Sequence, residues 1–430
     1  MKKIAIASLG CAKNLVDTES MLGIIARHGY EIEPDESLAD VIIVNTCCFI
    51  NDAKQESIDT IIDVATWKNE GCCKRLIVTG CLAERYKDEI LKELPEVDAV
   101  VGVGGIDDIL SIIDSDKNDV LCDKKYIFPT GERFITTPSY TAYLKIADGC
   151  DNRCTYCVIP SIRGEYQSRP IDDVLCEAEK LVANGAKELI VIAQDTTNYP
   201  DLCGLLERLC DIDGLTWIRL HYCYPERITD ELIDVMAKYE KICKYIDVPI
   251  QHCNDEVLRR MGRRGSKAQI VDVIGRLRAK MPDIAIRTTL ITGFPGETEE
   301  QYLELKAFIE DMRFERLGVF AYSQEEGTPA AEMDGQIDEK EKAQRQEILT
   351  FTQSEIAESL SAAKVGSTVR VLVEGYDELV GQHYGRSEAD SIDIDGKVFF
   401  KSAIRLTAGQ FVDVEISEIF ECDLFGTMKE

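Results

Sequence analysis

The stretch that decides the fold is YLKIADGCDNRCTYC, residues 143–157. It starts with a mostly apolar run, which predicts a buried β-strand, and continues into three closely spaced cysteines. This strand is the first of six predicted strands, with helical stretches between them: 143–147, 188–193, 216–220, 245–248, 285–291 and 317–322. Six βα units in succession predict a parallel sheet that curves into a partial (β/α)6 barrel. Ligands of such barrels bind at the carboxyl ends of the strands.

The chain on either side of these units has a different pattern. Residues 1–135 alternate apolar runs with amphipathic stretches, which predicts a parallel α/β sheet domain. A stretch without glycine or proline, 338–362, predicts a long helix that ends the second domain. Residues 363–430 carry β-type runs between spaced glycines, which predicts a small all-β barrel of the OB type. We therefore expect three domains, 1–135, 136–362 and 363–430.

The composition points to thiolate chemistry in the cytoplasm. The chain has 430 residues and lacks any apolar run of transmembrane length, so no membrane partner is expected. The apolar run after Lys3 is too short for a signal peptide. With 17 cysteines and only four histidines, metal or redox sites are favoured over disulfides in a cytoplasmic protein. Soft thiolates suit zinc or iron–sulfur clusters.

Cys150, Cys154 and Cys157 form the strongest motif in the sequence. Their spacing is C-x3-C-x2-C, on a loop that follows the first barrel strand directly. A structural zinc site takes four protein ligands, and no fourth cysteine or histidine lies nearby. Three thiolates leave one position open, which suits an iron–sulfur cluster with a substrate-binding iron. The alternatives are three incidental thiols and a zinc knuckle.

A second set of cysteines follows the predicted strands of the first domain, one cysteine to each strand. They are Cys11, Cys47 and Cys81. The ends of parallel strands meet at one edge of a sheet, so these residues are expected to converge although they are far apart in sequence. Three thiolates at one edge suggest a second cluster with an open iron. The alternative is that they are ordinary buried cysteines, which pack as small apolar side chains.

The cysteine loop resembles that of the radical S-adenosylmethionine superfamily, and Tyr156 matches an aromatic residue common there. The order of the three domains resembles the methylthiotransferase family over nearly the whole chain, with a TRAM-type barrel at the end. The resemblance implies a 4Fe–4S cluster on Cys150, Cys154 and Cys157 that binds and cleaves S-adenosylmethionine. It also implies an auxiliary 4Fe–4S cluster on the first trio, which carries the donated sulfur. An external electron donor is then required.

Several stretches resemble the branch of this family that modifies a ribosomal protein: 9–17, 45–50, 159–164, 220–225 and 320–329. That resemblance implies methylthiolation of the β-carbon of an aspartate in the twelfth small-subunit ribosomal protein, with two molecules of S-adenosylmethionine. The stretch Ser387–Ser391 matches the family only in part, which weakens expectations about contacts with the partner.

Charge favours a protein substrate over tRNA. The net charge is −29, and residues 363–430 hold 13 acidic and 7 basic side chains. Affinity for nucleic acid depends largely on basic side chains that neutralise phosphates, so tRNA is not an expected partner. An acidic barrel suits a basic ribosomal protein. Two alternatives stay open: a tRNA adenosine methylthiotransferase, and a non-enzymatic iron–sulfur or zinc protein that assists ribosome assembly.

Residues near the ends of the barrel strands are candidates for binding S-adenosylmethionine. By resemblance, Arg287 is expected to pair with its carboxylate and the turn at 293–298 to lie near its nucleoside. Structural ion pairs and a plain strand-to-helix turn are the alternatives. The full set of candidates is Gln194, Asp195, Arg287, Gly293, Gly296 and Glu297.

Overall fold

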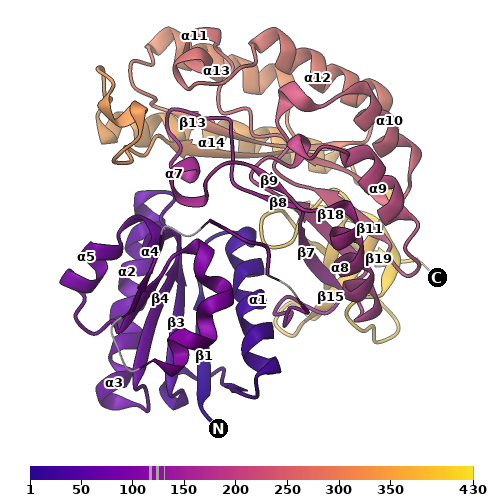
Figure 1. Cartoon of the computed structure of the whole chain (residues 1–430). Helices are drawn as coiled ribbons and strands as arrows, with labels where there is room; N and C mark the ends of the chain where they lie inside the picture. The colour runs from indigo at the N-terminus through magenta and orange to yellow at the C-terminus, as the bar shows by residue number, and fades with distance from the viewer. Residues whose placement is uncertain (116–118, 123–124, 130, 430) are drawn as a thin grey trace.

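The computed structural model describes residues 1–115, 119–122, 125–129 and 131–429. It contains two large parallel sheets with helices and a closed β-barrel at the C-terminal end. Figure 1 shows the N-terminal sheet in indigo beside the second sheet, whose helices α8 to α13 form an arc on its outer side. The predicted fold class is confirmed. None of the helices in the described ranges is long and apolar enough to cross a lipid bilayer.

The first sheet has six parallel strands in the order β2-β1-β3-β4-β5-β6. The strands are β1 Lys3–Ser8, β2 Glu31–Ile32, β3 Val41–Thr46, β4 Arg75–Gly80, β5 Ala99–Val101 and β6 Asp119–Leu121. The helices are α1 Ala12–Arg27, α2 Asn51–Ala65, α3 Trp67–Glu70, α4 Cys81–Arg85, α5 Lys87–Glu93 and α6 Ile109–Asp114.

Helices cover both faces of this sheet because its central strands are apolar throughout. In β3, Ile42 and Val44 belong to the core that includes Ile61 of α2. The neighbouring Ile43 points to the opposite face and belongs to the core that includes Met21 of α1. A parallel strand buried on both faces reads as a continuous apolar run, which is why the sequence pattern located it.

The second sheet has six parallel strands, and the chain visits neighbouring strands in sequence order. They are β7 Thr141–Lys145, β10 Glu188–Ile192, β11 Trp217–Leu220, β12 Ile242–Asp247, β13 Ala285–Thr292 and β14 Arg316–Ala321. The helices are α7 Ile159–Arg163, α8 Ile171–Ala183, α9 Leu202–Cys210, α10 Asp230–Lys238, α11 Asp255–Arg260, α12 Lys267–Lys280, α13 Glu299–Met312 and α14 Glu339–Ala362. The sheet does not close, so the predicted partial barrel is confirmed. A short pair, β8 Ala147–Asp148 with β9 Gln167–Ser168, was not predicted.

The C-terminal strands close into a barrel in the order β15-β16-β17-β19-β18. They are β15 Thr368–Asp377, β16 Gln382–Ser387, β17 Val398–Lys401, β18 Phe411–Phe420 and β19 Asp423–Met428. Their inward side chains form a separate small core that includes Val371, Val398, Phe400 and Val414.

This barrel packs on the face of the second sheet that its helices leave uncovered. Along β10 and β11, Leu189 and Ile218 point to the helices, whereas Glu188 and Arg219 point the other way. Glu188 pairs with Arg219 at 2.8 Å and with Arg386 of β16 at 2.7 Å, and all three side chains are buried. The barrel therefore fills the concave side of the sheet at the end opposite the cysteine loop.

Candidate metal centre

Cys11, Cys47 and Cys81 lie at the carboxyl ends of β1, β3 and β4, which are neighbouring strands. β3 lies between the other two, and its last residues pair in continuous register with both. The three loops therefore start from the same edge of the sheet, as the spacing of cysteines and strands predicted.

The side chain of Asn14 in α1 ties these three loops together. Its Nδ2 donates to the carbonyl of Leu9, at 3.0 Å, and to the carbonyl of Thr46, at 2.9 Å. Its Oδ1 lies 3.9 Å from the Sγ of Cys81. Leu9 and Thr46 come just before the Cys11 and Cys47 loops, so one buried amide fixes the relative position of all three.

Gly10 allows two of the cysteine loops to touch. Its φ is +85°, in the left-handed region. A Cβ on this residue would lie 2.6 Å from the Cβ of Cys47 and 2.9 Å from its Sγ. Only glycine therefore fits between Cys47 and the backbone before Cys11.

The second trio lies on the loop that follows β7 and β8. Cys150, Cys154 and Cys157 line one cavity of about 380 Å³. The Nδ2 of Asn152 lies 3.5 Å from the Sγ of Cys150 and donates to the Oδ2 of Asp195 at 2.7 Å. The loop is thus fixed to the end of β10, next to the expected ligand-binding edge.

A fully buried group of four charges links the segments that carry the two trios. Lys145 lies 2.5 Å from Asp17 and 2.7 Å from Asp148, and Arg163 lies 2.9 Å and 2.8 Å from the same two carboxylates. Burial acts to raise the pKa of Asp148, but the charges of Arg163 and Lys145 outweigh it and hold that pKa well below its ordinary value. These pairs join α1 of the first sheet to β7 and α7 of the second.

Arg163 extends from this group to the first trio. Its Nη2 donates to the Oδ1 of Asn14 at 2.8 Å and lies 3.7 Å from the Sγ of Cys81. Arg163 is also the last residue of α7, the short helix that follows Cys157. One guanidinium therefore connects the loop of the second trio to a cysteine of the first.

Both donor sets have the chemistry that iron–sulfur clusters take. In the part of the chain that the structure describes, no three histidine, cysteine or acidic side chains are placed to hold one metal ion. A cluster is bound differently, because each thiolate takes its own iron. Both sites offer three cysteines, and thiolates are the ligands that such clusters take.

The thiols respond differently to their surroundings. Burial raises the pKa of Cys81 and of Cys157, each to about 12. At Cys11 burial acts in the same direction, but the charges of Lys13 and Arg163 lower the pKa below its ordinary value. Burial also lowers the pKa of Lys13 itself. Metal binding would displace the protons of the buried thiols, so loading of both sites is expected to release protons.

Gln194 and Asp195 contact the loop of the second trio from β10. Gln194 donates to the Oδ1 of Asp148 at 2.9 Å, and its Oε1 is buried without a hydrogen-bond partner among the described residues. Asp195 is buried between Asn152 and Arg227, with which it forms an ion pair. Both residues therefore lie beside the cysteine loop. Their contacts with S-adenosylmethionine stay a prediction.

The other four candidates lie on or after β13 and are already engaged by protein groups. Arg287 pairs with Asp247 at 2.8 Å.

In the turn after β13, Glu297 accepts from the backbone N–H of Gly293 and lies 3.5 Å from His252. A Cβ on Gly293 would lie 2.5 Å from the Cγ of Lys342, and Gly296 is packed against Arg260. Among the described residues, none of these four forms a hydrogen bond or ion pair with a cysteine of either trio.

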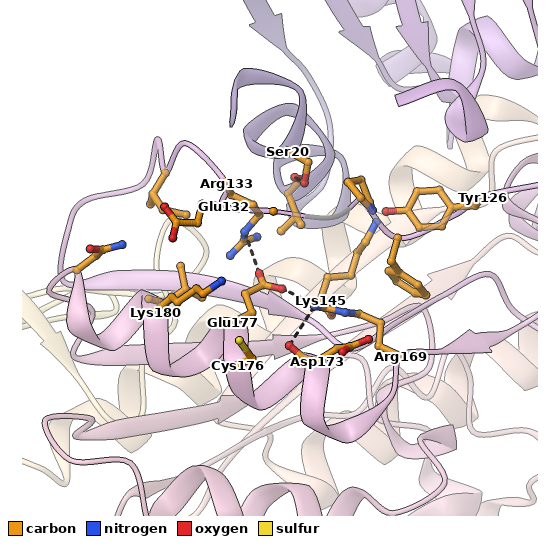
Figure 2. A pocket seen from close by; sticks show the side chains of 17 residues that line it. Ser20, Tyr126, Glu132, Arg133, Lys145, Arg169, Asp173, Cys176, Glu177 and Lys180 are labelled. Atoms are coloured by element: carbon orange, nitrogen blue, oxygen red, sulfur yellow. Dashed lines mark hydrogen bonds and ion pairs between the residues drawn. The ribbon is translucent and has the colours of Figure 1, made fainter. Parts of the chain in front are cut away.

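Another pocket, of about 280 Å³, lies between α1 and α8. Figure 2 shows Glu177 between the guanidinium groups of Arg133 and Arg169, at 2.9 Å and 2.5 Å. None of the predicted site residues lines this pocket. The candidate metal centre is therefore the region around the two cysteine trios.

Sequence reasoning missed Asn14 and Arg163 as members of the site. Both lie in stretches that resemble the ribosomal-protein branch, 9–17 and 159–164. That resemblance was the only feature of the sequence that could have marked them as site residues. The pattern could not show that residues 149 positions apart form a hydrogen bond.

Models of three families match the chain. They are the radical SAM superfamily at residues 144–309, the uncharacterized protein family UPF0004 at 3–102 and the TRAM domain at 365–428. Among solved structures, a radical S-adenosylmethionine methyltransferase, TsrM from Kitasatospora setae, is similar with a TM-score of 0.55 and 14% identity, over 74% of this chain and 73% of that one. The fold and the cysteine loop thus define a radical S-adenosylmethionine enzyme. That class implies a 4Fe–4S cluster and S-adenosylmethionine.

Relatives in the curated set define the family further. The protein from Lachnoclostridium phytofermentans named ribosomal protein uS12 methylthiotransferase RimO is 51% identical over 99% of both chains. Its namesake from Clostridioides difficile is 50% identical over 99% of this chain and 98% of the other. The chain belongs to this family of radical S-adenosylmethionine methylthiotransferases.

Proposed function

We propose that the protein transfers a methylthio group to the β-carbon of an aspartate in ribosomal protein uS12, using two molecules of S-adenosylmethionine. The observation that carries the proposal is that one buried charge group links the segments that carry the two cysteine trios, and that Arg163 of this group reaches Cys81. The names of the relatives at about 50% identity support uS12 as the substrate.

The trios would hold two different clusters. When bound, the cluster on Cys150, Cys154 and Cys157 with S-adenosylmethionine supplies the radical, and the cluster on the first trio supplies the sulfur.

The chain's own residues hold these loops in place. Asp195 and Asn152 fix the radical loop to β10, and Asn14 fixes the three auxiliary loops. Gln194, with its unpaired Oε1, is the candidate best placed to meet S-adenosylmethionine.

The three domains expected from the sequence would divide this work. Residues 1–135 would hold the auxiliary cluster, 136–362 the radical chemistry, and 363–430 would meet the ribosomal protein. The excess of acidic residues in the last segment supports a basic partner. An external donor must provide the electron, and the reaction would take place in the cytoplasm, where ribosomes are found.

Two cysteine variants test the division of roles, assayed without oxygen after cluster reconstitution. Cys150→Ala should abolish formation of 5′-deoxyadenosine. Cys47→Ala should leave that cleavage intact and stop formation of the methylthio product. Cys72→Ala is the control, since Cys72 is exposed and belongs to neither trio. Cleavage by the Cys150 variant would refute the radical site, and sulfur transfer by the Cys47 variant would refute the auxiliary site.

A further inference from the structure

Lys13 is a buried cation that faces an aromatic ring in place of a carboxylate. It lies two residues after Cys11 in the first turn of α1 and is only 7% exposed. Its Nζ lies 3.1 Å from the centre of the Tyr222 ring. It forms no ion pair with any residue in the described part of the chain. A buried charge without a counter-ion is costly, so its retention here calls for an explanation.

Other buried cations between the two sheets already have their anions, whereas Arg263, which lies over the Tyr224 ring beside Cys154, belongs to the second trio's surroundings. Lys145 and Arg163 share Asp17 and Asp148, and Arg287 pairs with Asp247. Beside the first trio, Lys13 is therefore the buried cation that has no carboxylate partner among the described residues and can bind an incoming anion.

The aromatic partner of Lys13 is held rigidly by the second sheet. Tyr222 follows β11 and has a φ of +60°, which is strained for a residue other than glycine. Its backbone N–H donates to the Oδ2 of Asp247 at 3.0 Å. The lysine comes from the first sheet and the ring from the second, so the pair lies where the two sheets meet. Strained backbone held by buried partners is found preferentially at functional sites.

The chemistry of the proposed reaction places a carboxylate in this region. The carbon that receives the sulfur in an aspartate is bonded directly to the side-chain carboxylate. That carboxylate must therefore come close to the auxiliary trio, and Lys13 is two residues from Cys11 in that trio. Entering a buried site, the carboxylate needs a charged donor to replace its hydration.

We propose that Lys13, supported by the Tyr222 ring, binds the side-chain carboxylate of the substrate aspartate and selects aspartate over uncharged residues. The inference rests on the proposed function and adds the residue that determines specificity. The Tyr222 ring, 3.1 Å from the Nζ of Lys13, limits the positions that the ammonium group can take.

The test compares Lys13→Met with Lys13→Arg and with a matched control. Lys238→Met is the control, because Lys238 also lies over a tyrosine ring, that of Tyr239 at 4.5 Å, but at the end of α10, which leads to the amino end of β12 and not to a cysteine loop. Binding of two fluorescent uS12 peptides, with aspartate or asparagine at the modified position, is measured by anisotropy on the reconstituted enzyme without reductant. Lys13→Met should weaken binding of the aspartate peptide roughly 10- to 100-fold and leave the asparagine peptide nearly unchanged. Lys13→Arg should keep most of the preference.

Each other outcome has a definite meaning. An unchanged preference in Lys13→Met overturns the proposal. A raised KM for S-adenosylmethionine with unchanged peptide binding would assign Lys13 to the carboxylate of that cofactor. Loss of iron from the variant would make Lys13 a counter-ion of the auxiliary cluster. The natural enzyme is also assayed with the aspartate peptide. If it does not methylthiolate this peptide, the proposed function itself has failed, independently of Lys13.

Discussion

At the scale of single residues, Gly10 controls how closely two cysteine loops approach. Alanine at this position would place its Cβ against Cys47 and would also be strained at φ +85°. We expect Gly10→Ala to displace the auxiliary loops and to lower bound iron from about eight to about four atoms per chain, since each 4Fe–4S cluster contributes four. The measurement is the iron content of the reconstituted protein, together with its electron paramagnetic resonance spectrum.

Gly366→Ala is the control for Gly10→Ala, because it introduces backbone strain without a steric clash of the new Cβ. Gly366 has a similar φ, +87°, but a Cβ there would meet no atom within 4 Å. This variant should bind as much iron as the natural protein. If Gly10→Ala also keeps its full iron content, the close packing of the Cys11 and Cys47 loops is not required for the auxiliary cluster.

The six cysteines show how far residue patterns reach. Short spacing made Cys150, Cys154 and Cys157 candidates, and positions after predicted strands made the other three candidates; their roles as cluster ligands stay a prediction. Arg287 was expected to bind a cofactor, yet its guanidinium is paired with Asp247 from a neighbouring strand. That pairing depends on which strands are neighbours in the sheet, and the order of strands cannot be read from a local sequence pattern.

At the scale of elements, β10 and β16 are joined through Glu188. Burial acts to raise the pKa of Glu188, but the charges of Arg386 and Arg219 lower it to about 2, so the carboxylate is ionised. Glu188→Gln would leave two guanidinium groups buried with one charge partner fewer. We expect the free energy of unfolding to fall by about 3–5 kcal/mol and amide exchange in β15 and β16 to accelerate. Denaturant titration and hydrogen exchange measure the two effects.

An exposed ion pair provides the control for this variant. Glu207 lies 3.3 Å from Lys238, and both side chains are largely in solvent. Glu207→Gln should cost less than about 1 kcal/mol. A similar small loss for Glu188→Gln would show that the barrel is held on the sheet by apolar contacts, such as the Trp217–Phe411 ring pair, and not by Glu188.

Long and apolar elements were predictable, and short polar ones were not. The strands of the second sheet were located because strands buried by helices leave a strong apolar signal. β8 and β9 have two residues each, and Gln167–Ser168 carries no apolar pattern. These strands form because tertiary packing brings the two segments together after β7. The order of strands in the C-terminal barrel was likewise beyond reach of the sequence pattern.

At the scale of the whole molecule, His221 makes the attachment of the barrel sensitive to acid. It is buried where β11 meets the barrel loop, and its Nε2 lies 2.9 Å from the Oγ of Ser391. Burial lowers its pKa to about 3, against about 6.5 in an unfolded chain. Between these values the unfolded form binds a proton that the native form does not. Native stability therefore falls as pH decreases below 6.5, by up to about 1.4 kcal/mol per pH unit.

His221→Asn should remove this part of the pH dependence. Urea unfolding of both proteins at pH 7 and pH 5 gives the comparison. The natural protein should lose about 1–2 kcal/mol more than the variant between the two pH values. Equal losses would show that His221 is protonated in the native state or exchanges protons without affecting stability.

The central claim concerns what the assembled molecule modifies. The measurement that tests it is made without oxygen: both clusters are reconstituted, reductant and S-adenosylmethionine are added, and uS12 and tRNA are offered in parallel. Products are identified by mass spectrometry. The account predicts a methylthio group on an aspartate peptide of uS12 and none on tRNA. A methylthio group on a tRNA adenosine, or 5′-deoxyadenosine with no modified product of either kind, would contradict it.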